Sequence, residues 1–367
     1  MSSKYVRRRL ITTFVIAGLL IASCAGGLDR DDRAVSITEV ELPVRPIGLS
    51  FLSWGSIAWL PSGWIVADRD PDLPLPHGAP DLVAFRPDGS EFGRLPIGPR
   101  ADCWRDETWR PTELPDGRLG FVRECYPKRL EGVDFAYHEI ELAAFDPATG
   151  DVDMLADLGD VWLGHIRLIL YEFAWDVTQA RGVAYFGNRI CDALVGVDGS
   201  GVHPLEAQLD HGTDRVRADA MFHAECEDTA RVRHAALSAD GRLAFGVSPS
   251  SVGRDGMARL DEPFELYFSD IDLAGPVRTP MRLEDVGPIL WSPDSRWLLF
   301  AASIRGRTAQ TWLYDTERSR VIGISSDRLS AAWSPDRRSI MAIRDIAGTE
   351  KVLDSEIVVV DVSSVID

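Results

Sequence analysis

Short apolar runs separated by turn sequences make up most of the chain. Residues 297–303 (WLLFAAS) and 357–360 (IVVV) are two such runs; Arg296 precedes the first, and Glu356 and Asp361 flank the second. Apolar runs of about four to eight residues between clusters of turn-forming residues predict β-strands joined by tight hairpins. The pattern therefore predicts an all-β protein.

One turn sequence recurs at the end of six of these runs. Two copies, Trp291-Ser292-Pro293-Asp294 and Trp333-Ser334-Pro335-Asp336, are nearly identical and lie 42 residues apart. Weaker copies begin at Trp59, Leu114, Asp176 and Leu237. In such a turn Pro fixes φ, Asp bonds to the local backbone, and Gly takes a positive φ. A repeat of this length predicts one supersecondary unit stacked several times.

A second hairpin signal follows each copy and completes a four-stranded unit. It contains Asp with Gly, Ser or Thr, as in Phe85-Arg86-Pro87-Asp88-Gly89, and six such signals occur. Two hairpins per unit give the four strands of a propeller blade. The last unit is one strand short, and residues 36–43 (SITEVELP) are strand-like without a partner. The sequence thus predicts a six-bladed β-propeller, with residues 36–43 as the outer strand of blade six.

The phrases at residues 291–303 (WSPDSRWLLFAAS) and 333–344 (WSPDRRSIMAIR) resemble the TolB-type, WD-like propeller repeats. The resemblance is strong over residues 285–365, fair over 50–160 and weak in the third unit. It implies a six-bladed fold that is often used for protein contacts, and it implies no particular partner.

The N-terminus resembles a bacterial lipoprotein signal. Residues 1–23 contain a basic region, an apolar run and a small-residue end, and Cys24 follows Ala22 and Ser23 directly. This order predicts a signal peptide over 1–23, lipidation of Cys24, and a polar tether over 24–34. An ordinary secretory cleavage after Ala25 is the alternative. Residues 35–367 would form a single propeller domain on the outer side of a cell membrane or outer membrane, held by the lipid alone.

Charge excludes one class of partner. The formal net charge is −18, and only three of the 39 basic residues are Lys. An acidic surface repels nucleic acid and favours a basic protein or peptide. The expectation is a monomer that binds such a partner and carries no cofactor.

Insertions concentrate on one face of the predicted ring. They lie in the loops that lead into the innermost strands or follow the second strands, at residues 98–109, 123–138, 159–171, 207–232 and 247–263. The four remaining cysteines belong to these loops. Neighbouring loops favour the pairs Cys103 with Cys125 and Cys191 with Cys226, because disulfides need closely spaced Cα atoms. Binding residues are expected on this elaborated face.

Catalytic and metal-binding patterns are weak in this sequence. No Gly-x-Ser-x-Gly elbow occurs, and residues 211–226 match no zinc spacing, so an amphipathic loop helix is expected there. Asp68, Asp70 and Asp72 alternate as in a calcium loop, but Leu73 replaces the required Gly, which favours a solvent-exposed loop. We expect no catalytic residue and no metal.

Five charged residues near the starts of the innermost strands are expected to line the channel entrance: Arg110, Glu172, His234, Asp285 and Arg328. Their charges are mixed, which is unlike the convergent carboxylates of a channel metal site. The sequence therefore favours a non-enzymatic scaffold that binds a protein or peptide. A metal-dependent hydrolase or lactonase, or a ligand-sensing lipoprotein, is the alternative.

Overall fold

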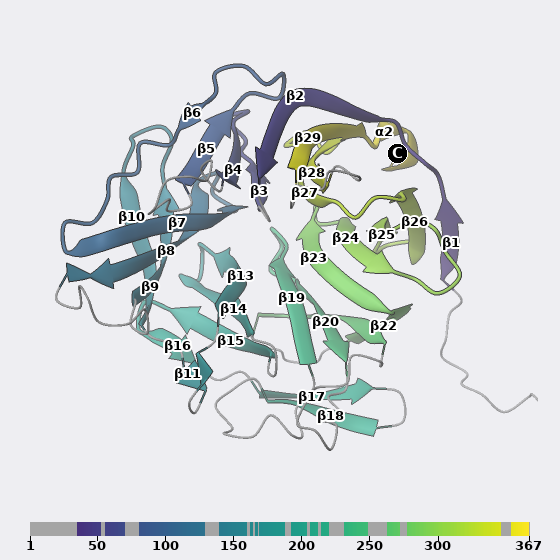
Figure 1. Cartoon of the computed structure of the whole chain (residues 1–367). Coiled ribbons are helices and arrows are strands. Elements are labelled where there is room, and N and C mark those ends of the chain that lie inside the picture. Colours follow the sequence, from purple (N-terminus) through teal and green to yellow (C-terminus); the bar gives the residue numbers. More distant parts are fainter. Residues whose placement is uncertain are drawn as a thin grey trace, which may run out of the picture. The chain divides into compact units, whose positions relative to one another are not determined.

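Six β-sheets surround a common axis in the computed structural model (Figure 1). The structure describes residues 35–52, 56–69, 81–128, 139–159, 162–163, 166–167, 169–187, 192–203, 206–211, 214–219, 231–248, 263–271, 277–345 and 354–366. Each sheet contains four antiparallel strands in order from the axis outward, and blade five carries one more. The six-bladed propeller expected from the repeats is confirmed.

The strands follow chain order within each blade. Blade one contains β3 (Ile57–Trp59), β4 (Ile65–Arg69), β5 (Asp81–Phe85) and β6 (Gly93–Arg94). Blade two contains β7 (Cys103–Glu113), β8 (Leu119–Pro127), β9 (Glu139–Phe145) and β10 (Val152–Gly159). Blade three contains β13 (Ile169–Asp176), β14 (Arg181–Gly187), β15 (Asp192–Asp198) and β16 (Gly201–His203).

The remaining blades repeat this arrangement. Blade four contains β19 (Arg231–Leu237), β20 (Leu243–Ser248), β21 (Phe264–Ser269) and β22 (Val277–Leu283). Blade five contains β23 (Asp285–Trp291), β24 (Trp297–Ser303), β25 (Thr311–Asp315) and β26 (Arg320–Ser325). Blade six contains β27 (Ser330–Trp333), β28 (Ser339–Asp345) and β29 (Asp354–Asp361), and its outer strand comes from the N-terminal part of the domain.

That outer strand is β2 (Val44–Leu52), which pairs antiparallel with β29. An N-terminal strand therefore closes the ring, as expected, but the predicted residues were wrong. Residues 36–43 were chosen because they are strand-like and precede the first repeat, whereas the true closing strand contains Pro46, which weakens its strand pattern. At the outer edge of a sheet a Pro is tolerated because one side of the strand needs no ladder bonds.

Residues 36–43 have a different place. β1 (Ser36–Glu39) pairs parallel with β26 as a fifth strand of blade five. The Glu39 carboxylate accepts hydrogen bonds from the backbone N–H groups of Thr308 and Ala309, at 2.9 and 3.0 Å. Leu42 is buried in the apolar cluster between blades five and six. This segment thus fastens blade five before the chain crosses to blade six.

The turns that join the first two strands of each blade occur where the repeated phrase predicts them. Gly63, Gly117 and Gly241 have φ between 81° and 85°, as the turn requires. The two WSPD copies lack this Gly, and Ser295 and Arg337 adopt positive φ instead. Buried apolar side chains pack between neighbouring blades, for example Leu60 and Phe121 between blades one and two.

Extra hairpins occupy two of the predicted insertions. β11 (Trp162–Leu163) pairs with β12 (Ile166–Arg167), and β17 (Glu206–His211) pairs with β18 (Asp214–Asp219). The helix expected within residues 211–226 was wrong over 214–219, where cross-strand pairing prevails over local helix propensity. The described helix α2 (Ser363–Ile366) has four residues. No helix in the described ranges has the length and apolar character needed to cross a bilayer.

Candidate functional site

The six innermost strands contribute equivalent residues to the centre of the ring. Their alignment follows from the hydrogen bond that opens each turn, such as Leu60 N–H to Trp64 O at 2.8 Å and Leu114 N–H to Arg118 O at 3.0 Å. We call the residue that donates this N–H the turn-opening position. In each innermost strand, the residue four places before it belongs to a set that we call the mouth ring. Its members are Ser56, Arg110, Glu172, His234, Pro288 and Ser330. The mouth ring belongs to the elaborated face, where the innermost strands begin.

Bulges interrupt four of these strands at or next to the mouth ring. The pairing register shifts between Trp109 and Thr112 in β7, between Arg233 and Ala235 in β19, and at the matching points of β13 and β23. Arg110 and His234 lie in two of the bulges with φ of 55° and 50°. Positive φ is uncommon for such residues, and residues with strained backbones cluster at functional sites. The bulges therefore mark the mouth ring as a candidate site.

Polar contacts join the blades at this level in three places. Between blades one and two, Arg110 Nη1 donates to Ser56 Oγ at 3.1 Å, and the Arg110 N–H donates to Asp68 Oδ2 at 3.2 Å. Between blades three and four, His234 Nδ1 lies 2.7 Å from Glu172 Oε1. Between blades five and six, Arg328 forms an ion pair with Asp285.

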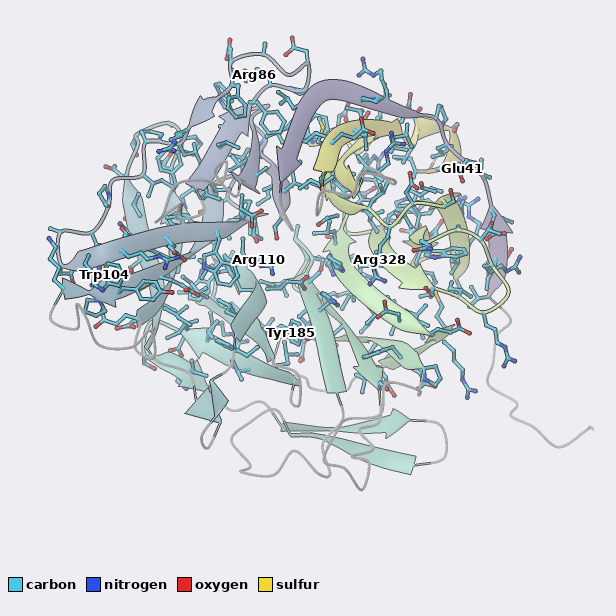
Figure 2. All side chains as sticks on the ribbon, viewed as in Figure 1. Glu41, Arg86, Trp104, Arg110, Tyr185 and Arg328 are labelled. Atoms are coloured by element: carbon cyan, nitrogen blue, oxygen red, sulfur yellow. A yellow bond between two sulfur atoms is a disulfide. The ribbon has the colours of Figure 1, made fainter. Side chains whose placement is uncertain are left out.

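All five channel-entrance residues expected from the sequence thus participate in these contacts. Arg110, Glu172 and His234 are members of the mouth ring itself. Asp285 and Arg328 lie at the start of β23 and just before β27. Arg110 and Arg328 are labelled near the centre of the ring in Figure 2. A Cβ at Gly287 would lie 2.8 Å from Arg328 Nη2, so a side chain there would displace the Arg328 guanidinium.

A central cavity of about 330 Å³ lies within the innermost strands. Its lining is mainly apolar, and its ionisable members are Arg110, Glu113 and Glu172. The residues directly before the turn-opening position also line it, further along each strand than the mouth ring. We call them the Trp ring: Trp59, Glu113, Trp175, Leu237, Trp291 and Trp333. An apolar cavity with a few polar groups is typical of a ligand site.

Two carboxyl groups of this site have raised pKa values. Burial raises the pKa of Glu113 to about 7. Burial also raises the pKa of Asp68 to about 6, although the Arg110 charge and hydrogen bonds from three backbone N–H groups act in the opposite direction. A carboxyl group that loses water without gaining a cation favours its neutral form.

Sequence reasoning missed Glu113 and misplaced Asp68. Asp68 ends β4 with a buried side chain, and Oδ1 accepts from the Ser56 N–H at 2.6 Å, so it is not part of a solvent-exposed loop. Asp70 and Asp72 lie outside the described residues. Aligning the six phrases would have exposed Glu113, because it stands where four of the copies have Trp.

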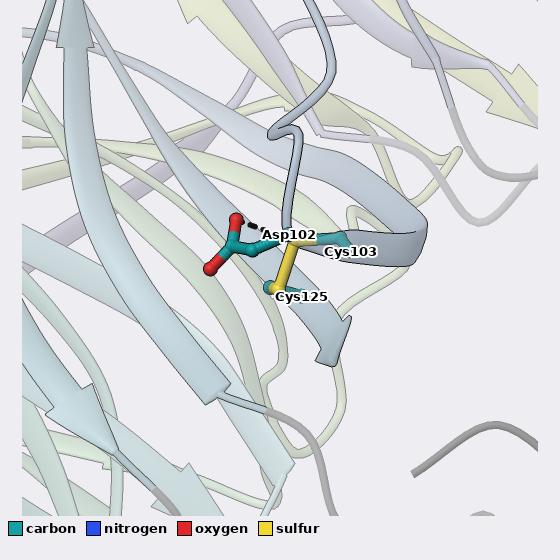
Figure 3. Close-up of side chains that lie close together, drawn as sticks. All are labelled: Asp102, Cys103 and Cys125. Atoms are coloured by element: carbon teal, nitrogen blue, oxygen red, sulfur yellow. Dashed lines mark hydrogen bonds between the residues drawn. A yellow bond between two sulfur atoms is a disulfide. The ribbon is translucent and has the colours of Figure 1, made fainter. Parts of the chain in front are cut away.

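The elaborated face of blade two contains a disulfide between Cys103 and Cys125, with Cα atoms 5.4 Å apart (Figure 3). This is one of the two pairs expected from the loop positions. Cys191, Cys226 and the lipidation site Cys24 lie outside the described residues. Within the described ranges, one group of three potential metal ligands occurs, Asp102 with Cys103 and Cys125. It does not suit a metal, because both sulfur atoms are bonded to each other.

Two arginines fasten the loop that precedes this disulfide. Arg123 Nη2 donates to Asp106 Oδ2 at 2.5 Å and to Gly98 O at 2.7 Å. The Arg100 N–H donates to the same Asp106 oxygen at 2.6 Å. The loop is therefore fixed against blade two by charge-assisted bonds as well as by the disulfide.

No known protein family matches the sequence, and no curated protein matches it either. Solved structures with similar folds include the GH93 α-L-arabinofuranosidase of Fusarium graminearum with arabinobiose, at 11% identity and a TM-score of 0.52 over 86% of this chain and 94% of that one. The α-L-arabinanase of Penicillium chrysogenum with arabinobiose is similar at 11% identity and a TM-score of 0.51, over 88% and 97%. TolB of Acinetobacter baumannii matches at 12% and 0.46, over 83% and 63%. At these identities the likeness shows the propeller fold alone.

Proposed function

We propose that this chain is a lipid-anchored, extracytoplasmic propeller that binds a protein or peptide without chemical turnover. The mouth ring carries this proposal: three polar contacts between blades surround the opening of an apolar cavity, and two of its residues have strained backbones. Such a ring is preorganised, so a ligand need not order it on binding. The overall charge of −18 favours a basic partner.

An unpaired carboxylate oxygen in the mouth ring supports a preference for ligands that donate hydrogen bonds. Glu172 Oε1 is hydrogen-bonded to His234 Nδ1, while Glu172 Oε2 is buried without a hydrogen-bond partner among the described residues. A buried carboxylate oxygen without a donor is unfavourable, so a ligand that donates there gains free energy. A basic or amide-bearing side chain meets this requirement.

Binding can be tested with synthetic peptides of equal length that are basic, neutral or acidic. We expect saturable binding of the basic peptides to the full-length protein, measured by fluorescence anisotropy, and weaker binding at higher salt. Glu172→Ala should reduce the affinity about tenfold, which corresponds to roughly 1.4 kcal/mol. Asp240→Ala is the matched control, since it removes one acidic group from a turn on the opposite face. Equal loss in both variants, or no binding of any peptide, would contradict the proposal.

The anchor is tested separately. Cys24→Ser should release the protein from the membrane fraction and abolish incorporation of a labelled fatty acid. A variant that is still acylated would show that the chain is anchored through another residue.

A hydrolase is a second candidate, favoured by one observation. Glu113 and Glu172 line the same cavity, and burial holds the pKa of Glu113 at about 7 while His234 pairs with Glu172. Glycoside hydrolases use two carboxyl groups held in different protonation states. Release of sugar from arabino-oligosaccharides that stops in Glu113→Gln would support this reading over a binding scaffold.

A further inference from the structure

One blade departs from the others at the Trp ring. Four blades place Trp at this position, blade four places Leu237, and blade two places Glu113. The Trp side chains fill space between blades: Trp175 and Trp333 are buried in the apolar clusters that join their blades to neighbours. A Glu side chain is smaller than an indole and carries a carboxyl group. Blade two therefore brings an ionisable group to a position that is otherwise apolar.

The neighbouring indoles show how side chains are oriented at this level. Trp291 Nε1 donates to the backbone oxygen of Ala236, in the preceding blade, at 3.0 Å. Trp59 packs with Met341 and Ile343 of the blade before it. By the same register Glu113 belongs at the junction with blade one, further along the strand than the mouth ring.

Glu113 has no hydrogen-bond or ion-pair partner among the residues that the structure describes. The other charged groups of the lining are already engaged, Arg110 with Ser56 and Glu172 with His234. Asp68, on the adjacent β4, accepts from the backbone of Ser56 and Arg110. None of these groups shifts the pKa of Glu113, whose rise to about 7 has burial as its cause.

We propose that the Trp-ring end of the cavity is a subsite for one cationic group, such as the ammonium of a lysine side chain, and that Glu113 is its counter-ion. This subsite rests on the proposed binding function and specifies its ligand. The cation supplies the partner that the half-buried carboxyl group lacks. The Trp residues that line the same part of the cavity offer apolar surface, which suits the methylene stem of a lysine side chain. An anion would face an uncompensated carboxylate.

The subsite also predicts proton release on binding. The free protein holds a proton on Glu113 over part of the neutral pH range, because burial raises its pKa to about 7. A bound cation favours the ionised carboxylate, so the proton must leave. Affinity for a cation should therefore rise by about tenfold between about pH 6 and about pH 8.

Two probes of equal shape test the subsite on the full-length protein. N-acetyl-lysine methylamide carries the ammonium, and N-acetyl-norleucine methylamide replaces it with a methyl group. We expect calorimetry at about pH 8 to show at least tenfold tighter binding of the lysine probe, and calorimetry at about pH 6 to show protons released to the buffer on binding. Equal binding of the two probes, or no binding of the lysine probe, would overturn the subsite.

Two variants assign the effect to Glu113. Glu113→Gln keeps the shape and removes the charge, so the preference for the lysine probe and its pH dependence should both vanish. Glu113→Trp restores the residue that four other blades carry, so it should fold and exclude the probe. Should Glu113→Trp not fold, Glu113→Gln alone decides the matter, because retention of the preference in that variant contradicts the proposal.

The outcomes separate this subsite from the proposed function. Basic peptides that bind equally well to Glu113→Gln and to the wild type would leave the binding function standing and refute the subsite. A lysine probe that binds through Glu113, with no peptide bound, would establish the subsite and refute the peptide-binding function.

Discussion

Asp68 in blade one accepts a hydrogen bond from the backbone N–H of Arg110 in blade two, at 3.2 Å. Arg110 lies in a bulge with φ of 55°, and the extra residue of a bulge is not paired in its own ladder. The carboxylate thus provides the acceptor that the strained backbone needs. The other carboxylate oxygen of Asp68 accepts a hydrogen bond from the backbone N–H of Ser56. The conformation of the mouth ring at Arg110 depends on this one side chain.

Replacement of Asp68 should destabilise the junction between blades one and two. Asp68→Ala leaves two N–H groups without their acceptor, so the free energy of unfolding should fall by about 2 kcal/mol. Asp68→Asn retains one acceptor oxygen and should lose about half as much. Urea denaturation provides the measurement, and an Asp68→Ala variant as stable as the wild type would show that Arg110 holds its conformation unaided.

Stability should depend on pH through Glu113. Its pKa is raised by burial from 4.5 to about 7, so ionisation disfavours the folded state. This destabilising contribution to the free energy of unfolding is absent below about pH 4.5, grows as pH rises, and is complete above about pH 7. Glu113→Gln should therefore be more stable than the wild type by roughly 1 to 3 kcal/mol at about pH 8, with little difference at about pH 4. A difference that does not vary with pH would contradict this reasoning.

The disulfide should contribute less than its loop length indicates. Cys103 and Cys125 are 22 residues apart, and such a loop corresponds to about 3 kcal/mol of chain entropy. The β7–β8 ladder and the ion pair between Arg123 and Asp106 already restrain the segment that the disulfide closes. Replacing both cysteines by Ser should therefore lower the free energy of unfolding by about 1 to 2 kcal/mol. The reduced wild-type protein should match the variant, which checks that the loss comes from the bond.

Truncation should distinguish the two N-terminal strands. A chain that begins at residue 44 loses β1 and Leu42 but keeps the closing strand β2, so its melting temperature should fall modestly. A chain that begins at residue 53 opens blade six and exposes β29 as a free edge, so it should aggregate or fail to fold cooperatively. Equal melting temperatures for both truncations would show that β2 does not close the ring.

The propeller could be predicted because its repeats are local. Each turn phrase and each apolar run can be identified within about ten residues, and their number decides the fold. The closing strand was misplaced because it is defined by pairing with β29, far along the chain, and Pro46 obscured its pattern. Long-range register is not visible in a short window.

The candidate site was partly predictable for the same reason. Three site residues could be chosen from their places near strand starts: Arg110, Glu172 and His234. Their hydrogen-bond partners depend on bulges that no sequence motif predicts. Glu113 is charged among apolar equivalents, so an alignment of the repeats would reveal it, whereas its raised pKa depends on burial in the assembled ring. Asp68 resembles a loop residue until β4 is placed beside β7.

The pairing of β2 with β29 sets the order in which the molecule can be assembled. β29 lies roughly three hundred residues beyond its partner, a separation that makes such contacts slow to form. Val44–Leu52 cannot take its place in blade six until Asp354–Asp361 has been synthesised. Closure of the ring thus joins one early and one late segment, and the central cavity has its full lining only when that pairing is complete.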